Sequence, residues 1–485
     1  MTRTRPDTTV PEAKLPADIW VLVSAAFIVA IGYGIIAPVL PQFAESFGLG
    51  VTASTIVVSS FAFFRLISAP AGGRLVNRLG ERPVYVTGLL IVAASTFAVA
   101  LAQSYWQLLL FRALGGLGST MFTVSAMALI IRLAPPTARA RAAGRYATAF
   151  LLGNIAGPVV GGLMAGWGMR VPFLVYAVAL LAAAAVVYFR LGRNERLLAA
   201  EQAAQDQAAE QAAQDQADRE PADRDHVTDG EDTGTAAEAP AALQPAPSAA
   251  EPTAPEAPAA PDPAPAPAPD DPAPVEPTPD NPAPDRSVMR FREAWRDSAY
   301  RAALVSGAAH GWTSMGIRVA IYPLFALHVL GAGAAVSGLA LTVFALGNTV
   351  AVAAVGRWAD RLGRRPFILT GLLILGISTL ALGFSASITM FFVLSVIAGI
   401  GAGLLNPSQQ AAVADVVGNH RAGGIVLSRY QMAIDTGAIF GPIIAGVLAE
   451  SMGYSAAFIA SGVVVLIAFA VWLGGRETLP ARAGT

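Results

Sequence analysis

The stretch Gly153-Asn-Ile-Ala-Gly-Pro-Val-Val-Gly-Gly162 reads GNIAGPVVGG, and the chain writes a similar stretch, GAIFGPIIAG, from Gly437 to Gly446. Both stretches lie inside long apolar runs. Glycine and proline weaken helices in water, whereas in lipid small residues let helix backbones touch and gain van der Waals contact. The two stretches therefore predict glycine-lined helices inside a membrane.

Each stretch places its glycines on one helix face, at every fourth position, with a proline that can kink the helix. The residues concerned are Gly153, Gly157, Pro158, Gly161 and Gly162, and then Gly437, Gly441 and Pro442. Two interpretations stay open. The glycines serve close packing alone, or they form a smooth bent seam on which the fifth and eleventh helices slide against the opposite bundle.

The composition agrees with a membrane setting. Of the 485 residues, 54% are hydrophobic and 13% are charged, about half the charge of an ordinary soluble chain. The absence of cysteine excludes disulfides, thiolate metal sites and cysteine nucleophiles. Residues 201–285 contain 20 of the 33 acidic residues, so the remainder has 30 basic and 13 acidic residues, a formal charge of +17.

Twelve apolar stretches are long enough to cross a bilayer, which takes about 20 residues. They lie near 19–40, 53–73, 83–102, 106–131, 145–166, 170–190, 303–327, 335–356, 366–385, 388–413, 426–449 and 454–474. The first is too long for a removable signal peptide and lacks a small-residue cleavage site. We therefore expect an all-α membrane protein with twelve spans, six before a central gap and six after it.

Arginines set the expected orientation, because cytoplasmic loops carry the excess of positive charge. The loops after even-numbered spans hold Arg74, Arg78, Arg82, Arg132, Arg139, Arg141, Arg357, Arg361, Arg364, Arg365 and Arg421. The alternate loops hold Arg170 as the main exception, and Glu45 and Glu450 instead. Both termini and the central gap are therefore expected in the cytoplasm.

The gap, residues 191–300, divides the chain into an N-terminal bundle (1–190) and a C-terminal bundle (301–485). It begins with a nine-residue repeat from Glu201 and continues as Pro-Ala-acid repeats such as APDPAPAPAPDDPAP. Such repeats favour extended polyproline II and cannot support a packed core. We expect a disordered acidic tether, with docking of a partner as the alternative.

The two halves are repeats of each other. VTGLL, starting at Val86, recurs as LTGLL from Leu369, and Gly116 falls on Gly399, an offset of 283. After one inserted residue, Gly157-Pro158 falls on Gly441-Pro442 at an offset of 284. Equal halves that face the same way imply two bundles related by an axis along the membrane normal, with a substrate cleft between them.

Four motifs, in order, resemble those of the major facilitator superfamily, in its twelve-helix drug/proton antiporter branch. They are the first-helix signature Gly32 to Pro41, the loop motif Gly73 to Gly80 with its copy Gly356 to Arg365, the fourth-helix arginine motif Arg112 to Gly118, and the fifth-helix motif Gly153 to Gly162. The resemblance implies two pseudo-symmetric six-helix bundles, proton coupling through Arg112, and a fifth helix that seals the cleft against ion leak. The tether is outside the resemblance.

Charged residues deep in a membrane span are costly and usually functional. By position, the interior candidates for the substrate and proton pathway are Arg65, Arg112, His310, Arg318 and Asp435. Asp435 is the best carboxylate to carry a proton or contact a substrate, and a fixed salt bridge to an arginine is its alternative role. His310 is either a proton-titrating group or a hydrogen-bonded interior histidine, and Arg65 could extend to the membrane surface.

Three interior arginines against one aspartate suit an anionic, zwitterionic or neutral amphiphile. Many drug antiporters instead bind cations through a carboxylate in the first bundle, and here the first span offers none. Further residues are candidates to line the cavity, although Tyr and Trp at helix ends are often interfacial anchors. These candidates are Tyr33, Phe122, Trp312, Tyr322, Asn406 and Gln409.

The loop motifs predict a cytoplasmic gate formed by Gly73, Asn77, Glu81, Arg132, Gly356, Asp360, Arg364 and Asp415. The resemblance implies that Asp360 faces a helix terminus of the opposite bundle, while Arg364 is held by Asp415. At the offset of 283, Arg364 becomes Glu81 and Asp415 becomes Arg132. Both ends of that pair have reversed sign, so we expect Glu81 to approach Arg132. Solvated loop charges without coupling are the alternative.

No enzyme motif is present: the four histidines are scattered, and there is no HExxH, GxxxxGK[ST] or G-x-S-x-G. We therefore expect a secondary active transporter and not an enzyme. Its expected function is proton-coupled efflux of a drug-like or amphiphilic small molecule by alternating access. Export of a sugar or another metabolite is the alternative, and a membrane sensor or scaffold is a remote one.

The expected partners are the small-molecule substrate, protons and the lipid bilayer, without nucleic acid. The energy source is the proton gradient, with no cofactor and no metal. A monomer in the bacterial cytoplasmic membrane is expected.

Overall fold

The computed structural model describes residues 15–135, 138–191, 207, 211, 289, 291–418 and 424–479. The described residues are helical, with no strand among them. The tether predicted over 191–300 therefore lies outside the described residues, except at its ends and at two isolated glutamines. Membrane helices satisfy every backbone hydrogen bond internally, which is why a lipid-embedded chain of this composition forms helices.

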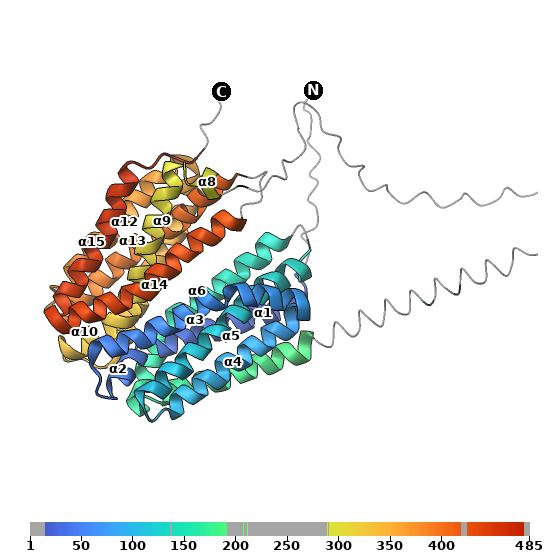
Figure 1. The fold of residues 1–485 in the computed structure, drawn as a ribbon, viewed down its shortest axis with the longest axis horizontal. Coiled ribbons are helices and arrows are strands. Elements are labelled where there is room, and N and C mark those ends of the chain that lie inside the picture. The colour runs from blue at the N-terminus through green and yellow to red at the C-terminus, as the bar shows by residue number, and fades with distance from the viewer. Residues whose placement is uncertain are drawn as a thin grey trace, which may run out of the picture. The chain divides into compact units, whose positions relative to one another are not determined.

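The N-terminal half contains the first six predicted spans (Figure 1). They are α1 (Ala17–Ile36) with the short α2 (Leu40–Glu45), α3 (Gly50–Leu79), α4 (Glu81–Leu101), α5 (Tyr105–Leu133), α6 (Arg139–Met164), which the 3₁₀ turn η2 (Ala165–Trp167) follows, and the helix Val171–Leu191. Each has the length and hydropathy to cross a membrane, apart from the short α2 and η2.

The C-terminal half repeats this order after the short α8 (Phe291–Ala294). Its spans are α9 (Ser298–Gly311), η3 (Trp312–Ile321) and α10 (Tyr322–His328) in succession, then α11 (Ala334–Leu362), α12 (Arg365–Leu382), α13 (Ile388–Val417), α14 (Gly424–Met452) and α15 (Tyr454–Leu473). Eleven of the described helices are individually long enough to span a membrane. The predicted seventh span is present as α9, η3 and α10, and the π-helical middle piece divides it.

Equivalent serines begin equivalent helices in the two halves. The Ser104 side chain accepts a hydrogen bond from the N–H of Gln107 at the start of α5, and Ser387 accepts one from the N–H of Met390 at the start of α13. Capping of this kind satisfies N–H groups that have no partner within the helix. The two serines are related by the repeat offset of 283, so the sequence repeat is also a repeat of local structure.

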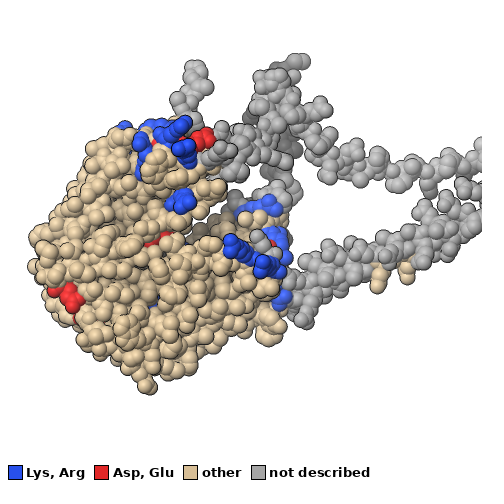
Figure 2. Space-filling model, in the orientation of Figure 1, with Lys and Arg blue, Asp and Glu red and all other residues tan. Residues whose placement is uncertain are grey.

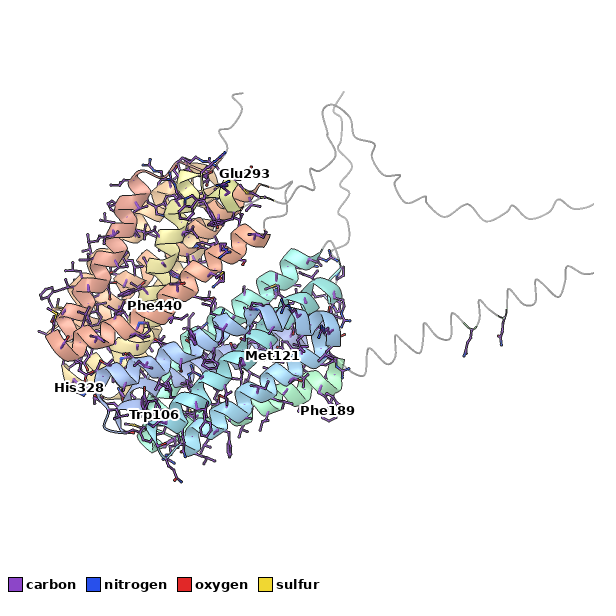
Figure 3. The ribbon with its side chains drawn as sticks, in the orientation of Figure 1. Trp106, Met121, Phe189, Glu293, His328 and Phe440 are labelled. Carbon is purple, nitrogen blue, oxygen red and sulfur yellow. The ribbon has the colours of Figure 1, made fainter. Side chains whose placement is uncertain are left out.

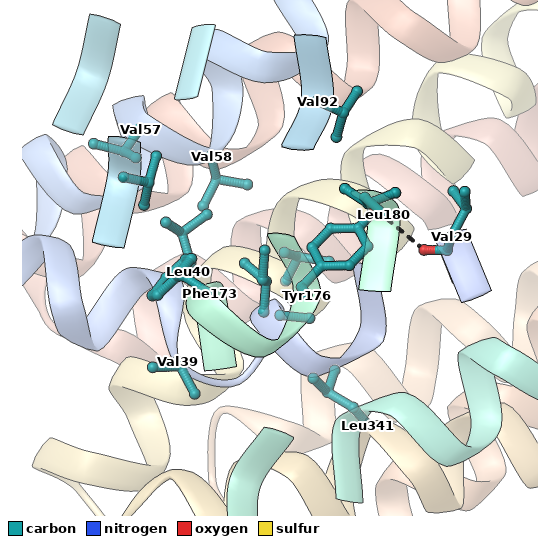
Figure 4. Packing of buried hydrophobic residues seen from close by; sticks show 14 of the residues in the cluster. Val29, Val39, Leu40, Val57, Val58, Val92, Phe173, Tyr176, Leu180 and Leu341 are labelled. Carbon is teal, nitrogen blue, oxygen red and sulfur yellow. Dashed lines mark hydrogen bonds between the residues drawn. The ribbon is translucent and has the colours of Figure 1, made fainter. Parts of the chain in front are cut away.

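Buried apolar side chains fill each half and continue between the halves. In the N-terminal half, Phe173 and Tyr176 are buried among Leu40 and Leu180, and the Tyr176 hydroxyl donates to the carbonyl of Val29 at 3.2 Å (Figure 4). The same core cluster includes residues of η3, α10 and α11. Between the halves, α6 packs against α11 and α3 packs against α14.

The glycine face of α6 packs within its own half. A Cβ added at Gly153 would lie 2.7 Å from atoms of α1. One at Gly157 would overlap the carbonyl of Ile31, and one at Gly161 would overlap that of Ile35. These three glycines therefore contact the first span and not the opposite bundle, and a seam on which the fifth span slides stays a prediction. The four-residue spacing serves close backbone packing of the fifth span on the first.

The C-terminal half repeats this contact, because Gly437 and Gly441 face Trp312 of η3 in the same half. The seam between the halves lies one residue further along the helix. A Cβ at Gly162 would come 2.7 Å from the carbonyl of Ala334 in α11, and one at Gly446 would overlap Thr55 of α3. Gly162 and Gly446 are equivalent at the offset of 284.

The two ends of the helices differ in charge. Lys and Arg side chains gather at one end of both halves (Figure 2), among them Arg78, Arg82 and Arg365. We name this the arginine-rich end, and the opposite end, where α2 and α10 meet, the α2/α10 end. Trp106 and Phe189 are exposed at opposite ends of the N-terminal half (Figure 3).

Helix α8 lies within the range that the sequence assigned to the tether. Ala294 of α8 and the nearby Met289 are buried in the core of the C-terminal half, together with Tyr300 of α9. The ordered C-terminal half thus includes residues before position 301.

Candidate functional site

Two buried arginines come from opposite halves. Arg112 lies on α5 with 7% of its surface exposed, and Arg318 lies on the π-helical η3. The Arg112 guanidinium lies over the ring of Phe61, and the Arg318 guanidinium lies over the ring of Phe344, each 4.1 Å from the ring centroid. A cation over an aromatic face gains electrostatic attraction but is not neutralised.

Tyr33 of α1 connects the surroundings of these two arginines. Its ring lies 6.4 Å from the Phe61 ring, and it interacts electrostatically with both Arg112 and Arg318. A cavity of about 10 Å³ adjoins Arg318 and is also lined by Tyr322, so it is about the size of one water molecule. The structure therefore brings four of the predicted pathway residues into one region, two of them, Tyr33 and Tyr322, from the aromatic candidates.

Asp435 and Arg65 face each other across the seam between α14 and α3. They interact electrostatically, and an Asp435 carboxylate oxygen accepts a hydrogen bond from the Gln431 amide at 3.2 Å. The pair makes no salt bridge within 4.0 Å among the described residues, so the fixed ion pair considered from the sequence is not formed in this state. The pKa of a half-buried carboxylate depends on the charges around it.

His310 is placed beside the same region. Its Nδ1 lies 3.3 Å from the Ser314 hydroxyl, and it interacts electrostatically with Arg318. This arrangement fits the hydrogen-bonded interior histidine and does not by itself assign a proton-carrying role.

Several aromatic and amide candidates have packing roles instead. Phe122 is buried in the core between α4 and α5, 6.4 Å from the Tyr85 ring. The Gln409 amide donates to the carbonyl of Ala303 at 3.0 Å, which fixes α13 to α9. Each of these residues packs within its own half, and their assignment to the cavity lining stays a prediction.

The remaining aromatic and amide candidates are Trp312 and Asn406. The Trp312 indole N–H donates to the Ser461 hydroxyl at 2.9 Å, and its ring packs on Gly441. Asn406 accepts a hydrogen bond from Gln410 one turn along α13. Trp312 therefore holds the seventh span to the last two spans.

Polar contacts join the halves at the α2/α10 end (Figure 3). His328 Nε2 lies 3.2 Å from the Glu45 carboxylate, and His328 Nδ1 lies 2.7 Å from the Tyr454 hydroxyl. The Gln42 amide donates to the carbonyl of Pro323 at 3.0 Å, in a buried position. These contacts close this end of the molecule.

Burial raises the pKa of the Glu45 carboxyl, and the neighbouring His328 opposes part of that rise. A second acid lies nearby, since the Glu450 carboxylate accepts the backbone N–H of Thr52 at 2.9 Å. Sequence reasoning missed this cluster. Its signal was available, because Glu45 falls on His328 at the offset of 283, so the two occupy equivalent positions of the repeat.

At the arginine-rich end, the two predicted ion pairs, whose acidic and basic residues are reversed between the halves, are confirmed. Arg132 and Glu81 form an ion pair at 3.5 Å, and Arg364 and Asp415 form one at 3.4 Å. Each pair lies within one half. Gly73 lies inside α3, and a Cβ added there would meet nothing within 4 Å.

The remaining predicted gate residues, Asn77, Gly356 and Asp360, have side chains or surroundings outside the described part of the structure. Glu477, which the sequence did not single out, accepts the backbone N–H groups of Arg364 and Arg365 at 2.8 and 3.0 Å. Burial favours a higher pKa for this carboxyl, but these and two further N–H groups outweigh it, so its pKa is lowered. The tail after α15 thereby fixes the loop motif of the C-terminal half.

The described residues contain no group of three or more His, Asp and Glu side chains that could hold a metal ion. The candidate site thus consists of Asp435, which faces Arg65, and of the ring-stacked Arg112 and Arg318. A polar cluster of Gln42, Glu45 and His328 lies at the α2/α10 end. Such an arrangement can bind an organic molecule between the halves and exchange protons, and it has no feature specific to bond-breaking chemistry.

Comparison with known proteins agrees with this arrangement. The profile described as Major Facilitator Superfamily matches residues 22–317 and 303–484. Multidrug resistance protein 2 of Bacillus subtilis (strain 168) is 32% identical over 169 residues, which are 35% of this chain and 42% of that protein. Quinolone resistance protein NorA of Staphylococcus aureus is 32% identical over 156 residues, 32% of this chain and 40% of that protein. The chain thus spans about two fifths of the length of these relatives.

Solved structures share the fold at low identity. A bacterial homologue of the human lysosomal transporter Spinster, in an inward-facing and unoccupied conformation, has a TM-score of 0.65 and 15% identity, over 94% of this chain and 96% of that chain. The human organic anion transporter MFSD10 has a TM-score of 0.56 and 15% identity, over 94% of this chain and all of the other.

Proposed function

The chain belongs to the major facilitator superfamily, whose members are transporters and not enzymes, and we propose that it exports drug-like or amphiphilic small molecules in exchange for protons by alternating access. The relatives named for multidrug and quinolone resistance support drug-like molecules as substrates. The energy source in this proposal is the proton gradient, and the transporter acts as a monomer in the cytoplasmic membrane.

The observation that carries the proposal is the unequal closure of the two ends. The ion pair of Glu45 with His328 and the hydrogen bond of Gln42 to Pro323 join the halves at the α2/α10 end. At the arginine-rich end, the ion pairs of Glu81 and Asp415 remain within single halves, and the halves diverge there (Figure 1). Because arginine-rich loops face the cytoplasm, this state opens inward, and its counterpart opens outward.

Asp435 is the proposed proton carrier. It is an acidic side chain inside a span on the seam between α14 and α3, and Arg65 faces it from the other half. When the halves rock, the distance between these charges changes, and a carboxylate that loses its cationic neighbour takes up a proton more readily. Proton binding is thereby linked to the state of the seam.

Everted membrane vesicles test this function. An inside-acid pH gradient is expected to drive uptake of lipophilic dyes, offered as cationic, neutral and anionic members, and a protonophore is expected to abolish it. Asp435→Asn should abolish the gradient-driven part, whereas Glu293→Gln, a matched change on the exposed part of α8 outside the spans, should leave it unchanged. Uptake of radiolabelled glucose without any dye would favour the metabolite exporter. No uptake of either would favour a sensor or scaffold.

A further inference from the structure

The interior of this protein carries positive charge that the described acidic residues do not neutralise. Arg112 and Arg318 make no hydrogen bond or ion pair with any described side chain, and the Nε atom of Arg112 is fully buried without a partner. Arg65 differs from them, because Asp435 faces it. An unpaired charge in a low-dielectric interior is costly and is retained where it serves a function.

The rings that support the two arginines occupy equivalent positions in the two halves, whereas the arginines themselves occupy different positions. Phe61 on α3 falls on Phe344 on α11 at the offset of 283, and each ring supports one guanidinium at 4.1 Å. The arginines come from different positions of the repeat, the fourth span for Arg112 and the seventh for Arg318. The same ring-supported cation has thus been built twice, from different spans, on the two sides of the central region.

A second, independent observation relates these cations to one another. Tyr33 interacts electrostatically with both guanidinium groups, and its ring lies 6.4 Å from that of Phe61. Its hydroxyl can donate to an anion that both arginines bind. The aromatic faces of Phe61 and Phe344 support the two guanidinium groups and leave N–H groups of these arginines to bind a ligand.

We propose that Arg112 and Arg318 together bind the carboxylate of an amphiphilic substrate, and that Tyr33 donates a further hydrogen bond to it. A guanidinium presents two parallel N–H groups that match the two oxygens of a carboxylate. A planar apolar body attached to the carboxylate would rest against the neighbouring rings. This inference rests on the proposed transport function and narrows its substrate class to organic anions.

The water-sized cavity beside Arg318 is too small for such a molecule in the state observed. The substrate therefore reaches Arg318 only after η3 and α11 rearrange, or it binds first at Arg112. The π-helical backbone of η3 is consistent with such a rearrangement, since π-helical segments occur frequently at functional sites.

Binding of 1-pyrenebutyrate and its methyl ester to the purified, detergent-solubilised protein tests the proposal. The two probes share the aromatic body and differ in the charge of the carboxyl group. Energy transfer from the protein's tryptophans to pyrene reports binding. The acid should bind about tenfold more tightly than the ester, and Arg318→Gln or Arg112→Gln should reduce the affinity for the acid to that for the ester.

Two further variants complete the test. Arg318→Lys keeps the positive charge but removes the two parallel N–H groups of the guanidinium. An intermediate affinity for the acid is therefore expected. Arg190→Gln removes an exposed arginine at the end of the sixth span and should change neither affinity. Equal binding of acid and ester to the unmodified protein, or binding of neither, would overturn the anion site. This comparison uses only the unmodified protein, so it does not depend on the folding of a variant.

Failure of the anion site is distinguishable from failure of the transport function. Proton-driven uptake of the methyl ester at the rate of the acid would leave the exporter in place and remove the carboxylate site. Absence of proton-driven uptake of every amphiphile offered would remove the exporter itself.

Discussion

The cluster that closes the α2/α10 end predicts a conformational equilibrium that depends on pH. His328 lies between Glu45 of the other half and Tyr454 of its own half, and Glu450 is the second acid at this end. The Nδ1 atom of His328 also lies 3.1 Å from the Leu324 carbonyl. The group at this end whose pKa depends on closure is the carboxyl of Glu45.

The sign follows from linkage. Burial raises the pKa of Glu45 in the closed state, with His328 opposing part of the rise, and opening returns this carboxyl to water. The state in which a group's pKa is higher binds its proton more tightly, so acidification favours that state. Acid on the outer face is therefore expected to close the α2/α10 end.

The magnitude can be worked from the geometry. At 3.2 Å, an effective dielectric constant of about 20 gives an attraction of about 5 kcal/mol. The His328 side chain is 39% exposed and that of Glu45 21%, and desolvation and side-chain ordering reduce such pairs to about 1 kcal/mol. His328→Gln should therefore shift the closed–open equilibrium about fivefold toward open while Glu45 is ionised. Glu45→Gln removes the titrating carboxyl, so it should make the equilibrium much less sensitive to pH.

Spin labels on the two halves can measure this equilibrium. The chain has no cysteine, so labels at Leu49→Cys and Met452→Cys, both exposed at this end, would be unique. Double electron–electron resonance would give the fraction of molecules with the short distance as the pH is varied from about 8.5 to about 5.5. The short-distance fraction should rise with acidity in the parent and rise much less in the Glu45→Gln variant.

A matched control separates a pH-dependent latch from general weakening. Gln42→Leu removes a contact between the halves that does not titrate, so it should lower the closed fraction equally at every pH. If the parent and Glu45→Gln showed the same pH dependence, or if the effect of Glu45→Gln were as uniform as that of Gln42→Leu, the latch would be refuted.

Two other predictions concern the arginine-rich end and the seam. Glu81→Arg and Arg132→Glu each place like charges about 3.5 Å apart, so each should slow transport severalfold because a bias of about 1 kcal/mol shifts the equilibrium about fivefold. The double exchange should restore transport, and a double variant no better than the singles at matched expression would contradict a coupled pair. Gly162→Leu, at the seam, should reduce transport tenfold or more with normal thermal stability. Gly157→Leu should instead lower thermal stability, and equal loss of stability in both would contradict this division.

The number of spans, the division into halves and their repeat could all be read from the sequence. These features depend on hydrophobic length and on spacing, which are local properties of the chain. The charge exchange between Glu81 with Arg132 and Arg364 with Asp415 could be predicted for the same reason. Each pair lies within one half, at positions that the repeat offset of 283 relates directly.

The direction in which each helix face points was decided by the tertiary structure. The spacing of Gly153, Gly157 and Gly161 predicts a face that permits close approach, but the same spacing fits a neighbour in either half. Packing places α1 on this face and α11 on the next one, at Gly162. Periodicity fixes which residues share a face, and it does not identify the helix that faces them.

The same limit applies to the polar sites. Glu45 and His328 are ordinary loop-end residues in the sequence, and only the meeting of α2 with α10 makes them an ion pair. Arg112 and Arg318 were recognisable as interior charges, because their spans are recognisable. Their support by Phe61 and Phe344 and their common neighbour Tyr33 required the packing of five separate helices, since contacts between distant segments depend on how those segments are placed in space.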